Sequence, residues 1–129
     1  MSSLDFDTDF EYQEASAGIL VPVRLIHGDR SVELRARLDT GAADCLFDSA
    51  YAEILGLPDG GIERHYRTVA GLFRAFGHEV TIETLGLTWP ALVFFHSTGD
   101  AAHAFVGRRG WLDRLGIVHG ERRLFVGRY

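Results

Sequence analysis

The chain has 129 residues, of which 47% are apolar and only 3 are proline, so it is long enough for one domain with a core and is not disordered. Its formal net charge of −5 and the lack of a binding motif argue against nucleic acid, and no apolar run reaches the roughly 18 residues that cross a membrane. Its single cysteine, Cys45, excludes an intrachain disulfide, and no basic-then-apolar leader opens the chain, so we expect a cytoplasmic protein.

Alternation of apolar and acidic residues marks the first predicted element. Residues 4–12 place leucine, phenylalanine, threonine and tyrosine on one face and only acidic side chains on the other, a period of two that predicts a strand. Residues 1–17 carry a charge of −5, whereas residues 107–129 carry +4 because they hold six arginines against Asp113 and Glu121. We therefore expect the acidic start to pair with the arginine-rich terminal strand, either closing a dimer or covering a sheet edge.

The elements that follow are predicted to be mainly strands joined by short turns. Alternating or continuous apolar runs predict strands over residues 19–26, 31–38, 45–47 and 87–95. Residues 27–30 supply a turn, and residues 49–55 favour a helical turn closed by Gly56 and Pro58.

Two hairpins and one further helix complete the predicted elements. Residues 62–85 resemble a long hairpin folded around Ala70-Gly71-Leu72, and a closing hairpin is expected around residues 119–121. The best helix candidate covers residues 111–115 and ends at Gly116. Because turn residues arrive at short intervals without the spacing of parallel strand–helix–strand units, the class is all-β with little helix.

One short motif is a candidate for catalysis. In Asp39-Thr40-Gly41-Ala42 an apolar strand leads directly into a carboxylate on a glycine turn, and the chain contains Asp-Thr-Gly once. A turn aspartate often only accepts backbone N–H bonds, so the motif alone leaves a structural interpretation open. An aspartic protease needs two such carboxylates, and a single copy per chain would therefore require a symmetric dimer.

Three segments, taken in order, carry a resemblance to a known family. They are Asp39-Thr40-Gly41-Ala42, the hairpin tip Thr68-Val69-Ala70-Gly71, and Phe105-Val106-Gly107-Arg108 before a short helix. Over roughly residues 18–129 the sequence resembles the retropepsin-like aspartic proteases, especially their small single-domain bacterial members. The resemblance implies an all-β closed barrel with a flap hairpin and one short helix, working as a symmetric dimer. Residues 1–17 lie outside the resemblance as an acidic N-terminal extension. The alternative to its pairing with the arginine-rich terminal strand is that it lies in the cleft as an autoinhibitory segment.

The resemblance also implies an activity. The chain would be an aspartic endopeptidase that cleaves polypeptides, with Asp39 of each protomer forming a pair that shares one proton. One carboxylate would activate water as general base while its partner protonates or hydrogen-bonds the peptide carbonyl. No cofactor or metal is expected, since the six histidines lack a tight ligand spacing.

Further residues receive supporting roles from the same resemblance. Thr40, Gly41 and Ala42 would shape the active-site loop, and Arg108 would support it through an acidic partner, for which Asp44 is the candidate. The residues Ala70, Gly71 and Leu72 would form the substrate-binding flap. Gly107 would let the inner strand pass closely beneath the loop.

Two residues depart from the family pattern and leave a second function open. Ala43 stands where the family usually has a polar residue, and Arg109 stands where an Asp or Asn is common. The alternative to an enzyme is a non-catalytic dimeric module that binds peptides or proteins and keeps the same fold.

Overall fold

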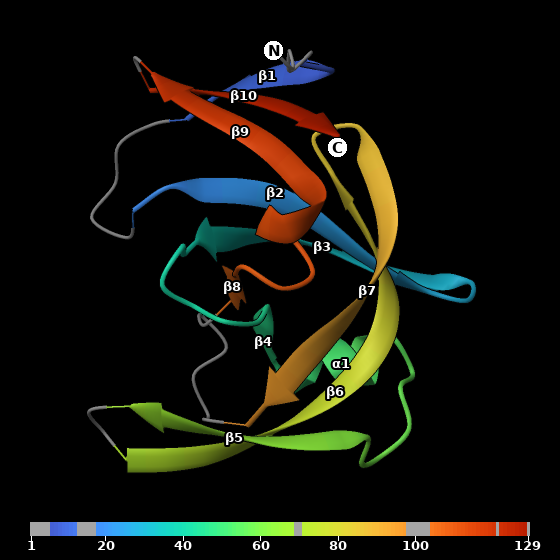
Figure 1. Cartoon of the computed structure of the whole chain (residues 1–129). Helices are drawn as coiled ribbons and strands as arrows, with labels where there is room; N and C mark the ends of the chain where they lie inside the picture. The colour runs from blue at the N-terminus through green and yellow to red at the C-terminus, as the bar shows by residue number, and fades with distance from the viewer. Residues whose placement is uncertain (1–5, 13–17, 69–70, 98–103, 121, 129) are drawn as a thin grey trace.

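The computed structural model describes residues 6–12, 18–68, 71–97, 104–120 and 122–128, and these are mostly strands (Figure 1). In chain order the elements are β1 (Thr8–Glu11), β2 (Leu20–His27), β3 (Arg30–Leu38), β4 (Leu46–Asp48), α1 (Ser49–Ile54), β5 (Ile62–Thr68), β6 (Gly71–Thr84), β7 (Leu87–His96), β8 (Ala104–Val106), the 3₁₀ turn η1 (Leu112–Arg114), β9 (Leu115–Gly120) and β10 (Arg123–Arg128).

Six strands close into a barrel. The hydrogen-bonded order is β2-β3-β8-β4-β7-β6, and a further antiparallel pairing of β2 with β6, with Leu25 opposite Ile82, completes the circuit. A closed circuit leaves no free edge. Along each strand, side chains that point into the barrel alternate with side chains that point outward, and the inward ones fill the interior. Val21, Val23 and Leu25 of β2 are all buried there. The predicted all-β closed barrel is confirmed.

The β5–β6 hairpin (β5 with residues 71–77 of β6) projects from this barrel. The two strands pair from Ile62 opposite Gly77 to Thr68 opposite Gly71, and β5 pairs only with β6 among the described strands. The remainder of β6 pairs with β7, so the predicted hairpin over residues 62–85 is right for its outer part and wrong beyond Gly77. The reason is length: a 14-residue strand is long enough to serve both the barrel and the hairpin.

The two helical predictions have different outcomes. The helical turn after β4 is confirmed as α1, which Asp48 caps by accepting the Ala50 N–H at 2.9 Å. The helix expected over residues 111–115 is wrong, because only a three-residue 3₁₀ turn forms. Leu115 and Gly116 belong instead to β9, where their pairing with β10 outweighs so short a helix.

A separate three-stranded sheet, in the order β1-β10-β9, lies at the other end of the molecule from the β5–β6 hairpin (Figure 1). Strand β1 pairs antiparallel with β10, and Arg123 contacts the carboxylates of Asp9 and Glu11. The expected pairing of the acidic start with the arginine-rich end is therefore present, within one chain. Tyr12, directly after β1, is buried in the core, and Phe10 of β1 packs against the core.

Candidate active site

Asp39 lies where β3 ends, and it begins a tight loop. Its backbone N–H donates to the Val106 carbonyl of β8 at 3.0 Å, which continues the parallel pairing of the two strands. Its carboxylate Oδ1 accepts the Gly41 N–H at 2.9 Å, and its carbonyl accepts the Ala42 N–H at 3.2 Å. A Cβ added to Gly41 would come within 3.2 Å of that carboxylate oxygen, so glycine fits the turn with least strain.

The Asp39 loop (residues 39–44) reaches the surface of the single chain. Asp39 is half-buried, while Thr40 and Gly41 are exposed. The aspartate therefore accepts a bond from its own turn and is also open on the side that faces solvent. One chain presents one such carboxylate at this place.

The segment that follows β8 holds the Asp39 loop in place through backbone hydrogen bonds. Arg108 N–H donates to the Ala42 carbonyl and Arg109 N–H to the Ala43 carbonyl, both at 2.9 Å. A Cβ added to Gly107 would lie 2.4 Å from the Asp44 carbonyl oxygen, which is closer than a Cβ approaches a non-bonded atom. The expected close approach at Gly107 is confirmed.

Arg108 does not pair with Asp44, so that prediction is wrong. Its Nε donates to the Ala42 carbonyl at 3.4 Å, and this is a bond to the loop backbone rather than to an acid. Asp44 instead accepts from Arg109, with Nε at 3.0 Å from Oδ1. The parallel bridge between Asp44 and Arg109 sets this choice, because it brings those two residues side by side.

Two further partners of Asp44 come from β5, and sequence reasoning missed both. Arg64 Nη1 donates to Oδ2 at 2.7 Å and the Tyr66 hydroxyl donates to the same oxygen at 2.6 Å. The alternation of a strand places Arg64 and Tyr66 on one face, and that signal was available in the sequence. The register that brings this face to Asp44 was not.

The electrostatics of Asp44 follow from these donors. Burial alone would raise its pKa, since the residue is only 4% exposed, but the bonds from Tyr66, Arg64 and Arg109 outweigh burial and lower the pKa. Burial and the Asp44 carboxylate together raise the pKa of the Tyr66 hydroxyl. The carboxylate is therefore ionised, and the tyrosine acts as a donor to it.

The predicted flap residues lie at or beside the end of the β5–β6 hairpin. Gly71 has φ +122°, a backbone conformation that favours glycine, and Leu72 is 67% exposed. Alternation places Leu72 and Phe73 on opposite faces, and Phe73 stacks on Tyr66 with ring centroids 5.4 Å apart. Ala70 is outside the described residues.

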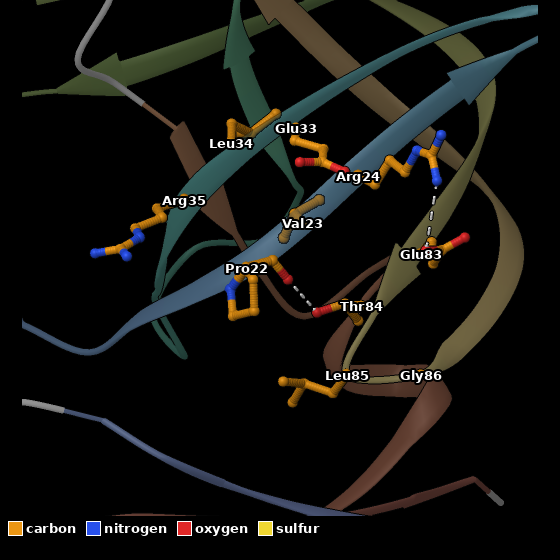
Figure 2. Close-up of a pocket in the computed structure, with 10 residues that line it drawn as sticks. All are labelled: Pro22, Val23, Arg24, Glu33, Leu34, Arg35, Glu83, Thr84, Leu85 and Gly86. Atoms are coloured by element: carbon orange, nitrogen blue, oxygen red, sulfur yellow. Dashed lines mark hydrogen bonds and ion pairs between the residues drawn. The ribbon is translucent and has the colours of Figure 1, made fainter.

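A pocket of about 440 Å³ lies elsewhere on the molecule (Figure 2). It opens between β2, β3 and the turn from β6 to β7, where Thr84 donates to the Pro22 carbonyl at 2.6 Å. None of the predicted site residues lines it. Within the described part of the chain, no group of three or more histidine, cysteine or acidic side chains is placed to hold a metal, and no helix is long and apolar enough to cross a membrane.

The barrel, its projecting hairpin and the loop at Asp39 define a retropepsin-like fold. Among solved structures, the chain is similar to a retropepsin-like aspartic protease from Rickettsia conorii, with a TM-score of 0.70 and 18% sequence identity. The likeness covers 92% of this chain and 98% of that one. Comparisons with protein-family models and with curated proteins find no match.

Proposed function

We propose that the protein is an aspartic endopeptidase that acts on polypeptides as a symmetric homodimer. The observation that carries the proposal is the position of Asp39, half-buried on a glycine turn that β8 and the following residues fasten from beneath. A rigid loop of this kind holds a carboxylate in a fixed position, as general acid–base catalysis requires.

The second carboxylate would come from Asp39 of the partner protomer. Exposure of Thr40 and Gly41 leaves that end of the loop open to a second copy, and a twofold axis there would bring identical loops together. Two carboxylates within about 3 Å would share one proton, because both cannot ionise cheaply. The ionised one would take a proton from water while the protonated one would donate to the peptide carbonyl.

The β5–β6 hairpin would serve as the flap over the bound peptide. The contacts of Arg64 and Tyr66 with Asp44 join the hairpin to the loop that carries Asp39. At the other end of the hairpin, Gly71 has φ +122°, a backbone conformation that glycine adopts without strain. Closure of such a hairpin would exclude water other than the reacting molecule.

The acidic extension and the cell compartment complete the proposal. We assign residues 1–17 to an N-terminal extension, of which β1 pairs with the edge of β10, and residues 18–129 to the protease domain. A single buried thiol, Cys45, suits a reducing cytoplasm.

One observation favours a dimeric binding module instead of an enzyme. Ala43 has no polar side chain, and its carbonyl already accepts the Arg109 N–H at 2.9 Å. The polar side chain usual at this position in the family is missing, and with it a group that could orient a scissile peptide.

Comparison of the wild type with Asp39→Asn tests the proposal. Both proteins would be incubated with an unfolded polypeptide from acidic to neutral pH, with the exposed Asp59→Asn as matched control. The proposal expects cleavage by wild type and Asp59→Asn and a loss of at least a hundredfold in Asp39→Asn. Equal cleavage by all three, or none by a wild type shown to be dimeric, would reject it, and peptide binding without cleavage would support the module.

A further inference from the structure

Asp44, the last residue of the Asp39 loop, has a buried side chain with several hydrogen-bond donors around it. Its side chain is 3% exposed, and it accepts hydrogen bonds from Tyr66 at 2.6 Å, from Arg64 at 2.7 Å, and from Arg109 at 3.0 and 3.4 Å. Removal of a donor would leave a buried carboxylate less well paired, which is far more costly than loss of a surface contact.

These donors belong to different segments of the chain. Arg109 follows β8 beneath the loop, whereas Arg64 and Tyr66 lie two residues apart on the inward face of β5. One carboxylate at the end of the Asp39 loop therefore connects that loop with the projecting hairpin.

Aromatic contacts extend the connection across the hairpin and into the barrel. The Arg64 guanidinium lies over the Phe94 ring of β7 at 4.4 Å from its centroid, and Tyr66 meets the same ring edge-on at 6.1 Å. Tyr66 also stacks on Phe73, its cross-strand neighbour. The hairpin is thus held from Arg64 to Tyr66 on one strand and at Phe73 on the other.

The opposite face of the same hairpin is held far more weakly. There Glu63 meets His65 at 2.9 Å and Arg74 at 3.6 Å, and all three side chains are at least 44% exposed. Exposed ion pairs of this kind contribute little, because water screens them. The Asp44 side is therefore the one that fixes where the hairpin stands.

We propose that Asp44 is a positioning residue that anchors the β5–β6 hairpin, through Arg64 and Tyr66, to the Asp39 loop. The described part of the hairpin that these contacts hold, Arg64 to Tyr66 on β5 and Phe73 on β6, then keeps its place relative to Asp39. The consequence for substrate rests on the proposed function, whereas the anchor itself does not.

Hydrogen–deuterium exchange of the full chain without substrate tests the anchor. Tyr66→Phe keeps the ring and its stacking but removes one donor to Asp44, and Tyr12→Phe is the matched control, since it removes a hydroxyl that bonds His119 in the distant three-stranded sheet. We expect exchange over residues 62–66 and 73–77 to accelerate about tenfold in Tyr66→Phe alone, the factor that corresponds to one hydrogen bond to a charged group. If Tyr66→Phe left exchange over residues 62–66 and 73–77 unchanged, the proposal would be overturned. It would also be overturned if Tyr66→Phe accelerated exchange equally in β9 and β10.

Kinetics separate the anchor from the proposed function. If the wild type cleaves peptides, Tyr66→Phe should raise KM several-fold with kcat little changed, because the hairpin closes less readily over the substrate. A variant that is merely less folded would lower apparent kcat at constant KM, and that result counts against the anchor. Accelerated exchange together with equal cleavage by wild type and Asp39→Asn would support the anchor while rejecting the proposed protease.

Discussion

Gly107 lies directly against the Asp44 carbonyl: a Cβ on Gly107 would be 2.4 Å from that oxygen and 2.7 Å from the Ala42 carbonyl oxygen. Neither obstacle is a flexible side chain, so the backbone of the Asp39 loop itself would have to move. The segment after β8 that carries Gly107 thus fixes the position of the Asp39 loop, and glycine is what permits the contact.

Gly107→Ala should therefore lower the free energy of unfolding by about 3 kcal/mol and shift the loop that carries Asp39. Gly120→Ala is the matched control, because a Cβ there would meet nothing within 4 Å. Urea titration of both variants measures the difference. Equal stability of the two variants would show that the loop does not rest on Gly107.

Asp44→Asn should destabilise the protein in a pH-dependent way. Burial opposes ionisation of Asp44, but its three donors lower its pKa, so the ionised carboxylate stabilises the folded state at every pH above the ordinary aspartate pKa of 3.8. This contribution is lost as the pH falls through the lowered folded pKa. We expect a loss of about 3 kcal/mol at pH 7 that shrinks below pH 4.

The control for this variant is Asp59→Asn, an exposed aspartate whose replacement should leave the unfolding curve nearly unchanged. A difference between wild type and Asp44→Asn that stays constant from pH 7 to pH 3 would contradict the role given to ionised Asp44.

Deletion of residues 1–17 should weaken the fold without increasing cleavage. It removes β1, exposes the edge of β10 and takes Phe10 and Tyr12 away from the core. We expect a lower melting temperature and a smaller dimeric fraction by sedimentation. Faster peptide cleavage by the truncated protein would instead identify the extension as an inhibitor.

Cys45 should be unreactive in the folded protein. The thiol is fully buried, and burial raises its pKa to about 12, so very little thiolate exists at pH 8. Alkylation by iodoacetamide should be slow in buffer and fast in denaturant. Rapid stoichiometric labelling of the native protein would contradict the burial of Cys45.

Local patterns in the sequence predict much of the barrel and the position of Asp39. The apolar run over residues 19–26, which contains the buried Val21, Val23 and Leu25, predicts a strand, and the turn at Asp39 follows from Gly41. Both features depend on neighbours within a few positions. This is the range over which sequence patterns are informative.

Long-range register was not predictable in the same way. Neighbouring residues of an extended segment point to opposite sides, so only the bridge between Asp44 and Arg109 decides that Arg109 rather than Arg108 meets the carboxylate. The helix expected to end at Gly116 failed for a related reason, since pairing with β10 draws Leu115 into a strand.

The central claim is that two Asp39 carboxylates, one from each protomer, act together. Wild type and Asp39→Asn chains refolded together in equal amounts would form mixed dimers, and cleavage is measured per wild-type chain. Random pairing places about half of the wild-type chains in mixed dimers, so the activity per wild-type chain should fall to about half. Activity that stays unchanged in a mixture shown to contain mixed dimers would mean that one Asp39 suffices, and would contradict the account.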